Sequence, residues 1–469
     1  MESRRGSPAQ LVPIVAGYAG LLLVWDFEAR PLFFLLLVAG TFVALWRFSR
    51  ASGSEIPLRT LLLVAAVSRA LLVPVPASLS DDVYRYLWDG RVALAGFDPY
   101  RLAPDDPTLE PLRERGGAEL REPTAHRDVE TVYPPLAIAL FAVAASSPFE
   151  LWAWKGMMAL FDLASCWLLW KVARRTGRPT ASAIWYAWNP LAAIESAAMG
   201  HVDAAGACAL LAALYGLLSL REPGEGERRI PRPVVAGALT AAGALVKLVP
   251  LVLVPLFVLR ARSAAFTLAL TAVLAAGLAP MVLPSQGPPP GLVRYGVSWE
   301  YNGLLFEPLW RSIEAADVAS DVKGTLDMIR SRVAGSEPLE ALYPYVYPEL
   351  LAKAALALGL AWVLLLGLGV RDLLDATFWT VAGALLLSAT FYPWYALWAL
   401  PFAALRRSAP WLVLSLSLQA AYLPRLFGWS AWPTTWLVVW MPFVLTAGVA
   451  AARRRSARPP AAGAAGALP

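Results

Sequence analysis

The sequence is poor in charged residues, cysteine and histidine for its length of 469 residues. Charged residues make up 16% of it, against about a quarter in soluble proteins, which excludes an ordinary soluble enzyme. The two cysteines, Cys166 and Cys208, both lie in apolar runs, where a buried small hydrophobic residue is expected rather than a disulfide or a metal pair. The chain also lacks a Walker A motif, a Rossmann glycine pattern, HExxH and paired CxxC, which argues against nucleotide hydrolysis in the cytoplasm.

Hydrophobic residues are abundant, at 58% of the chain, and the mean hydropathy is +0.55. Apolar runs of about 17–25 residues, enough to cross a hydrocarbon layer of ~30 Å, recur along the whole sequence. We therefore predict an all-α polytopic membrane protein with about 12 to 14 spans. The clearest spans are 11–25, 31–47, 57–77, 150–173, 180–199, 203–220, 264–283, 347–370, 373–390, 393–406, 409–426 and 433–451. Residues 133–148 are short and flanked by prolines, so a half-span or re-entrant helix is expected there. Residues 231–260 are broken by Lys247 and Pro250, so a broken pair of helices is expected.

The distribution of charge predicts the topology. Arginine and lysine gather in the short connections, and such connections are typically cytoplasmic. Two long polar loops fall on the opposite side: 79–131, with 12 acidic and 7 basic residues, and 285–346, with 8 acidic and 5 basic residues. We expect one transmembrane domain over 1–451 with both termini cytoplasmic, a disordered cytoplasmic tail over 452–469, and a bacterial inner-membrane location. The net charge of +6 is thus a topology signal and not a signature of nucleic-acid binding.

The first long loop opens with two adjacent carboxylates, Asp81 and Asp82, directly after an apolar span. An unpaired carboxylate at the membrane boundary is costly and needs a reason. It can act as a general base or as an oxygen ligand for a divalent cation. The alternative is a helix N-cap, with Ser80 or Asp81 capping a helix through residues 84–91.

The chain has two histidines, one in the first long loop and one at the junction of two predicted spans. His126 falls in the first long loop, where a solvent-exposed, inert histidine is the alternative to a functional one. Glu195, His201 and Asp203 stand within nine residues at the junction of two spans. Three polar groups at such a junction need either mutual pairing or a cavity, so structural pairing and a ligand role are both open.

Lysine and aromatic residues supply the remaining candidates. Lys247 lies in an apolar run, where its ammonium needs an anion, either a phosphate or a neighbouring carboxylate. The second loop contains Trp299, Tyr301 and Asn302, and the segment 391–398 returns further aromatics to the outer boundary. Aromatic rings with an amide suit the stacking and hydrogen bonding of a sugar ring, whereas an interfacial aromatic belt is the alternative.

These motifs in this order resemble the GT-C glycosyltransferases. The resemblance rests on SDDVYRYLWDGRVALAGFDPY, TVYPPL, WNPLAAIESAAMGHVDA, KLVPLVLVP, SWEYNGLLFEPLW and FYPWY, and runs from about residue 78 to 405. The chain is similar to bacterial polyprenol-phosphate-mannose-dependent mannosyltransferases and to GPI mannosyltransferase I. This likeness implies an inverting transfer of a hexose, most naturally mannose, from polyprenyl phosphate to an acceptor hydroxyl on a lipid, glycan or protein at the outer membrane face.

The resemblance also implies roles for particular residues. Asp82 matches the essential base of the family, with Asp81 adjacent. Here the two acids are neighbours, whereas family members more often separate them by one residue. The remaining site residues predicted are donor-phosphate ligands (Lys247, Arg85, Tyr392) and sugar or acceptor ligands (His201, Asp203, Glu195, His126, Trp299, Tyr301, Asn302, Trp394). We predict no metal ligand and no cofactor, and leave dependence on a divalent metal open.

Two other classes fit a polytopic chain. A lipid or sugar transporter or flippase without transferase activity would share the broken helices, but transporters usually show internal hydropathy repeats and this sequence shows none. A scaffold subunit of a cell-envelope assembly would use its acids only as helix caps. None of the three classes calls for a nucleic-acid partner.

Overall fold

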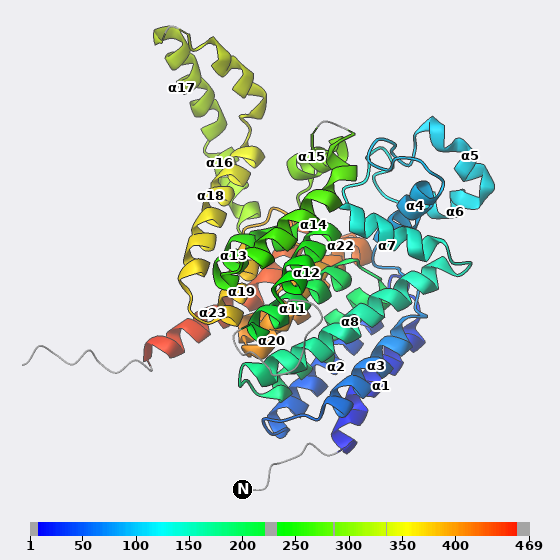
Figure 1. The fold of residues 1–469 in the computed structure, drawn as a ribbon. Helices are drawn as coiled ribbons and strands as arrows, with labels where there is room; N and C mark the ends of the chain where they lie inside the picture. Colours follow the sequence, from blue (N-terminus) through cyan, green and yellow to red (C-terminus); the bar gives the residue numbers. More distant parts are fainter. Residues whose placement is uncertain (1–7, 221–231, 285–286, 334, 457–469) are drawn as a thin grey trace, which may run out of the picture.

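The computed structural model describes residues 8–220, 232–284, 287–333 and 335–456, and the described chain is helical almost throughout (Figure 1). Five of the described helices are long and apolar enough to cross a membrane: Pro31–Ala51, Glu150–Arg175, Ala264–Val282, Pro348–Gly369 and Ala431–Ser456. A sixth span results if the bent pair Pro190–Ala198 and Asp203–Ser219, which meet at 118°, is counted as one. The predicted all-α polytopic membrane fold is confirmed.

The first half of the chain supplies helices of very different length. They are η1 (Pro8–Leu11), α1 (Val12–Val24), α2 (Pro31–Ala51), α3 (Leu58–Leu72), α4 (Asp82–Leu94), η2 (Pro107–Leu109), α5 (Glu110–Leu112), η3 (Arg113–Gly117), α6 (Ala118–Arg121), α7 (Pro135–Ala145), α8 (Glu150–Arg175), η4 (Thr180–Ala183), α9 (Ile184–Ala187), α10 (Pro190–Ala193), η5 (Ile194–Ala198) and α11 (Asp203–Ser219).

The second half continues the bundle and adds the second loop. Its helices are α12 (Arg232–Val246), η6 (Val249–Leu253), α13 (Val254–Ala261), α14 (Ala264–Val282), α15 (Pro290–Ser298), α16 (Phe306–Ala315), α17 (Val318–Arg332), η7 (Glu337–Tyr345), α18 (Pro348–Gly369), α19 (Leu373–Leu386), η8 (Pro393–Trp398), α20 (Leu400–Leu405), α21 (Ala409–Ser417), η9 (Leu418–Tyr422), α22 (Leu423–Phe427), η10 (Ala431–Thr435) and α23 (Trp436–Ser456).

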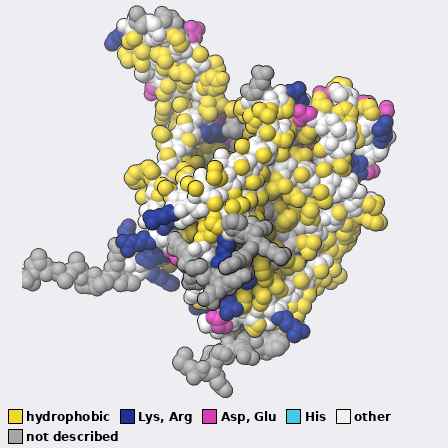
Figure 2. Space-filling model, viewed as in Figure 1, with side chains coloured by type: hydrophobic (Ala, Val, Ile, Leu, Met, Phe, Trp, Pro, Cys, Tyr) yellow, Lys and Arg dark blue, Asp and Glu magenta, His cyan; other side chains and the backbone are white. Residues whose placement is uncertain are grey.

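Large hydrophobic side chains face outward along the long helices. Leu23 is 77% exposed, Leu268 70% and Leu358 76%. Figure 2 shows hydrophobic side chains over much of the visible flank of the bundle. An outward apolar surface of this extent is unfavourable in water but matches hydrocarbon. The protein is therefore an integral membrane protein.

Among the described residues, fewer continuous helices are long and apolar enough to cross a membrane than the 12 to 14 spans predicted, because several predicted spans are broken. Residues 180–199 form four short helices, and the break at Asn189–Pro190 has Asn189 Oδ1 accepting a hydrogen bond from the Leu191 amide. Residues 393–406 and 409–426 are likewise divided, with prolines in the first turns of α20 and α22. Proline lacks the amide that would continue a preceding helix, which explains these divisions.

The predicted interruptions at 231–260 and 133–148 are present, whereas the predicted start of the tail is not. Residues 231–260 break between α12 and η6 at Lys247–Leu248, and 133–148 contain only the 11-residue helix α7. The chain remains helical to Ser456, so the predicted tail, 452–469, begins inside α23. Residues 457–469 lie outside the described part of the chain.

The two long loops lie on the same side of the bundle. In Figure 1 the helices α4 to α6 and α15 to α17 lie towards the top, whereas α1 begins near the bottom. Arg294 and Asp128, which belong to different loops, pair at 2.7 Å. The two loops therefore lie next to each other at one end of the bundle.

Candidate active site

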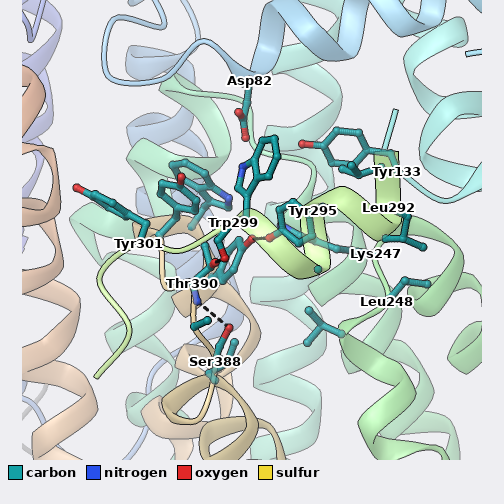
Figure 3. Close-up of a pocket in the computed structure, with 18 of the residues that line it drawn as sticks. Asp82, Tyr133, Lys247, Leu248, Leu292, Tyr295, Trp299, Tyr301, Ser388 and Thr390 are labelled. Atoms are coloured by element: carbon teal, nitrogen blue, oxygen red, sulfur yellow. Dashed lines mark hydrogen bonds between the residues drawn. The ribbon is translucent and has the colours of Figure 1, made fainter. Parts of the chain in front are cut away.

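A cavity of about 710 Å³ opens beneath the two long loops (Figure 3). Its polar part is lined by Asp81, Asp82, Arg85, His126, Lys247, Trp299, Tyr301, Tyr392 and Trp394, all of which the sequence predicted as site residues. Its apolar part is lined by Leu248, directly before η6, and by side chains of η6, α18 and α19, including Val249, Val252, Leu356, Leu360 and Leu385. The cavity thus joins a polar chamber to a hydrocarbon-like wall.

Asp82 is the first residue of α4 and points down into the cavity, as Figure 3 shows. Its amide donates to Ser80 Oγ at 3.3 Å, so Ser80 meets one of the free amides at the start of the helix. Asp81 occupies the cap position but its side chain makes no capping hydrogen bond. The capping alternative therefore applies to Ser80, and both carboxylates line the cavity.

The environment of Asp82 combines burial with nearby cations. Burial raises the pKa of the Asp82 carboxyl above its usual range, while His201 and Lys247 act in the opposite direction and Asp81 adds to the increase. The Tyr86 hydroxyl donates to Asp82 Oδ2 at 3.2 Å. A carboxyl with a raised pKa next to cations is suited to accept a proton during a reaction at near-neutral pH.

The sequence required an anion for Lys247, either a phosphate or a neighbouring carboxylate. In the structure its partner is a carboxylate. Its Nζ lies 2.9 Å from both Oδ1 and Oδ2 of Asp203, and 4.2 Å from the centre of the Tyr395 ring. Asp203 is fully buried and also accepts a hydrogen bond from Trp398 Nε1 at 2.6 Å. Lys247 still lines the cavity, and 17% of its side chain is exposed.

Glu195, His201 and Asp203 lie behind the cavity wall. All three are fully buried and none lines this cavity, in contrast to the prediction that they contact sugar or acceptor. The reason is mutual pairing: His201 Nδ1 lies 2.9 Å from Glu195 Oε2, and Asp203 pairs with Lys247. Burial of these polar groups is tolerated because each meets a partner.

An aromatic stack forms one wall of the cavity. Tyr301 and Tyr392 stack at 4.8 Å between ring centres, Tyr392 and Trp394 at 4.5 Å, and Trp394 and His201 at 3.8 Å. Backbone hydrogen bonds fix the wall, because the Tyr301 amide donates to Ala389 O and Tyr301 O accepts from the Phe391 amide. The second loop and the segment before η8 are thereby joined as one surface.

Asn302 follows Tyr301 but turns away from the cavity. It has a left-handed backbone, with φ of 56°, is 95% buried, and does not line the cavity. Its carbonyl oxygen accepts from Trp440 Nε1 at 3.0 Å. The predicted sugar-binding role of Asn302 is therefore replaced by one in holding the second loop against α23.

His126 and Trp299 join the two loops across the mouth of the cavity. Their ring centres lie 4.3 Å apart, and both residues line the cavity. Gly291 of α15 lies so close to the carbonyl of Glu130 that an added Cβ would stand 2.4 Å from its oxygen. His126 is thus a contact between the loops rather than an isolated surface histidine.

Arg85 is held by protein groups on the cavity wall. Its Nε lies 2.9 Å from Asp89 Oδ1 and its Nη2 donates to Val129 O at 2.8 Å. These contacts fix the orientation of the guanidinium between α4 and the end of the first loop. Its assignment as a donor-phosphate ligand remains a prediction.

Several cavity residues escaped the sequence-based prediction. Lys353 pairs with Glu300 at 2.7 Å and Arg425 pairs with Glu28 at 3.2 Å, and both cations line the cavity. Tyr133, Tyr295, Tyr395 and Tyr422 also line it. For Lys353 the sequence does contain a signal. Lys353, Leu356 and Leu360 recur at helical spacing in α18, so a single cation lies on the same helix face as two leucines.

A metal site is not assembled in the described residues. Within 8–220, 232–284, 287–333 and 335–456, no three His, Cys, Asp or Glu side chains converge as ligands. Asp81 and Asp82 are adjacent carboxylates without a third such group. We therefore derive no step through a metal ion.

A model described as the MptA_B family, alpha-(1->6)-mannopyranosyltransferase, N-terminal domain, matches residues 10–263. The chain belongs to this family. The matched segment extends from α1 to the end of α13 and contains Asp82, His201 and Lys247, whereas Trp299 and Tyr301 lie beyond it. Among curated proteins and among solved structures, none matches the chain.

Membership of this family confirms the resemblance read from the motifs. The family is a GT-C-like mannosyltransferase family, so the protein is a membrane glycosyltransferase that transfers mannose. The family description gives neither the donor nor the membrane face on which transfer occurs.

Proposed function

We propose that this protein is an inverting mannosyltransferase that takes mannose from a polyprenyl-phosphate donor and transfers it to an acceptor hydroxyl on a lipid, glycan or protein at the outer face of a bacterial inner membrane. The observation that carries the proposal is the cavity itself. A half-buried carboxylate, Asp82, faces its polar part, and leucine and valine side chains, among them Val249, Val252, Leu356 and Leu360, line its apolar part.

The lipid part of the donor fits the apolar wall. Lys353, Leu356 and Leu360 recur along one face of α18, and Leu248, Val249 and Val252 line the same cavity. A prenyl chain that binds along this wall leaves membrane lipid for another apolar surface, so its binding costs little. The attached sugar then reaches the polar chamber. A nucleotide sugar has no group that would use such a wall.

The chemistry follows from the groups around the chamber. As the acceptor oxygen attacks the anomeric carbon, its proton passes to the Asp82 carboxylate. The bond between the anomeric carbon and the phosphate oxygen breaks, and its electron pair remains on the departing lipid phosphate. Lys247 lines the same cavity, and its cation stabilises the negative charge that develops on that phosphate.

The family description, α-(1→6)-mannopyranosyl transfer, also constrains the donor. An inverting reaction that makes an α linkage requires a β-linked mannosyl phosphate. For this protein we therefore propose a β-mannosyl polyprenyl phosphate as the donor and the 6-hydroxyl of a mannoside as the acceptor group. In this proposal Asp82 is the base and Asp81 is the alternative, because the Asp82 carboxylate points into the cavity.

The experiment uses purified full-length protein in detergent with β-farnesyl-phosphate mannose as donor and octyl α-mannoside as acceptor. We expect an α-(1→6)-linked dimannoside, with its linkage position identified by the NMR correlation between H1 of the new mannose and C6 of the acceptor, and its configuration by the one-bond C1–H1 coupling. The α-anomer of the donor and GDP-mannose serve as controls and should yield no product. Transfer from GDP-mannose without any lipid carrier, or retention of the donor configuration, would overturn the proposal.

The other class that the composition allows is a lipid or sugar transporter. Membership of a mannosyltransferase family favours transfer over transport. In a vesicle assay a transporter would move the lipid-linked sugar across the bilayer without forming a disaccharide, whereas the proposed enzyme forms one. A scaffold subunit would do neither.

A further inference from the structure

A chain of buried polar groups runs behind the wall of the cavity and returns to it at both ends. The Tyr422 hydroxyl donates to Glu195, with its oxygen 3.0 Å from each carboxylate oxygen. Glu195 Oε2 lies 2.9 Å from His201 Nδ1, and His201 Nε2 lies 3.2 Å from Ser80 Oγ. Tyr422 and Ser80 line the cavity, whereas Glu195 and His201 do not.

The fold fixes His201 from several sides. Gly200 has a left-handed backbone, with φ of 72°, and its carbonyl accepts from Trp154 Nε1 at 2.6 Å. The His201 amide donates to Glu195 O at 2.8 Å, and the imidazole stacks on Trp394 with 15° between the rings. Such a set of contacts leaves the ring one orientation, with its two nitrogens facing Glu195 and Ser80.

These surroundings favour a charged imidazole. Nδ1 faces a buried carboxylate, although the N–H does not point straight at the oxygen, so the contact is one of opposite charges rather than an aligned hydrogen bond. Nε2 faces a hydroxyl oxygen, which can accept. A fully buried carboxylate is costly unless a cation or donors meet it, and the Trp394 ring beneath His201 also favours a cation.

The same imidazole affects Asp82. Ser80 Oγ connects the two residues: it lies 3.2 Å from His201 Nε2 and accepts a hydrogen bond from the Asp82 amide at 3.3 Å. The pKa of the Asp82 carboxyl is raised by burial, and among the nearby charges His201 lowers it most. His201 therefore acts on Asp82 both through Ser80 and through its charge.

Other titratable groups also face this pair. Around Asp82 they are Asp81 before α4, Tyr86 within it, Lys247 after α12, Tyr133 before α7, Tyr392 before η8 and Tyr422 of η9. Around His201 they are Glu195 of η5, Asp203 of α11 and Lys155 of α8, which packs against Gly200. Of these groups, Glu195 alone contacts both His201 and Tyr422.

We propose that His201 is a positioning residue for Asp82: as an imidazolium held by Glu195, it keeps the Asp82 carboxylate ionised and, through Ser80, fixes the first turn of α4. This inference rests on the proposed role of Asp82 as the base. It assigns to His201 and Glu195 a function that does not require contact with sugar.

The test is the pH dependence of kcat/KM for transfer from β-farnesyl-phosphate mannose to octyl α-mannoside. Loss of a positive charge near Asp82 raises the pH at which the base becomes protonated. In His201→Gln we expect the acidic limb of the profile to move up by about one pH unit or more. Glu195→Gln, which removes the partner that holds the charge, moves it in the same direction.

Two matched variants separate charge from packing. Ser80→Ala removes the hydroxyl between His201 and α4 and lowers kcat without moving the acidic limb. Thr377→Val alters a buried hydroxyl that bonds only within its own helix, to Leu373 O, and leaves the profile unchanged. An unshifted acidic limb in folded His201→Gln or Glu195→Gln would overturn the inference, whatever the overall activity.

A measurement on the unaltered protein tests the inference even if the variants fail to fold. The chain has two histidines, so ¹⁵N-histidine labelling gives two imidazole signals, and His126→Gln assigns them. We expect the His201 signal of an imidazolium at pH 6, and a neutral ring there would contradict the inference. An active Asp82→Asn variant would instead refute the proposed function, so the two failures are distinguishable.

Discussion

Lys247 and Asp203 form a bidentate pair, with both Asp203 carboxylate oxygens 2.9 Å from the lysine Nζ. Asp203 lies at the start of α11, fully buried, whereas Lys247 lies at the break between α12 and η6 and reaches the cavity. Two of the three ammonium protons suffice for Asp203. The third can donate to an anion in the cavity. The ion pair therefore fixes the position of the ammonium group and leaves one N–H for a ligand.

This arrangement predicts two separable effects of Lys247→Ala. Donor binding weakens because the phosphate loses a cation. The protein is also destabilised, by about 3 kcal/mol, because a buried carboxylate is left without its counter-charge. Titration calorimetry with β-farnesyl-phosphate mannose and thermal unfolding measure the two effects.

The control for Lys247→Ala is the double variant with Asp203→Asn, which removes both charges. It should recover most of the stability without recovering donor affinity. Unchanged donor affinity in the single variant would remove Lys247 from the phosphate site.

The pH dependence of transfer should reflect Asp82. Because burial raises the pKa of its carboxyl, the base becomes protonated at a higher pH than an exposed aspartate would. Activity therefore falls with decreasing pH, starting above the usual aspartate range. The sign for stability is opposite, since the protonated form is favoured in the folded protein and this contribution is lost as pH rises through the folded pKa. A kcat/KM profile from pH 4 to 9, with unfolding at each pH, separates the two.

The aromatic contact across the loops predicts a specific effect on the acceptor. Trp299 lines the cavity and packs on His126, so Trp299→Ala removes both a stacking surface and part of the link between the loops. We expect the KM for octyl α-mannoside to rise by roughly three- to tenfold, with donor affinity unchanged. Trp429→Ala, at a side chain that is 45% exposed and outside the cavity, is the control. Equal effects of the two variants would refute a specific role for Trp299.

An ion pair that does not line the cavity should govern stability alone. Arg69 and Asp162 are fully buried and lie 2.6 Å apart, and the Tyr186 hydroxyl also donates to Asp162. Asp162→Ala leaves the Arg69 charge unpaired and should lower the free energy of unfolding by about 3 kcal/mol or more. Arg69→Met combined with Asp162→Leu should restore much of it. Transfer activity per folded molecule should be unchanged in the double variant, and a large loss would connect this pair to the site.

The sequence was sufficient to predict the long elements of the fold. The spans at 31–47, 150–173, 264–283 and 347–370 correspond to α2, α8, α14 and α18, because an uninterrupted apolar run of this length leaves a membrane chain little choice but a helix. The break at Lys247 was also predictable, since a charge and a proline coincide there. The four-helix division of 180–199 was not, because its break depends on a local cap by Asn189 and on packing around it.

The site was predicted in part for a similar reason. Asp82, His126, Lys247, Trp299, Tyr301 and Trp394 reach the cavity, since the polar and aromatic character that marked them is also what lines such a chamber. Sequence proximity could not show that Glu195 and His201 pair with each other behind the wall. It also could not find Arg425, whose neighbours in the cavity are distant in the chain.

The central claim is tested most directly by the rate of transfer in Asp82→Asn. Asparagine keeps the size and the hydrogen-bonding capacity of the side chain but cannot accept the proton. We expect kcat to fall by about 10³-fold or more, in the range lost with a general base, while donor binding and thermal stability persist. Asp81→Asn, measured in parallel, should retain most of the rate. Wild-type kcat in a folded Asp82→Asn variant would contradict the account.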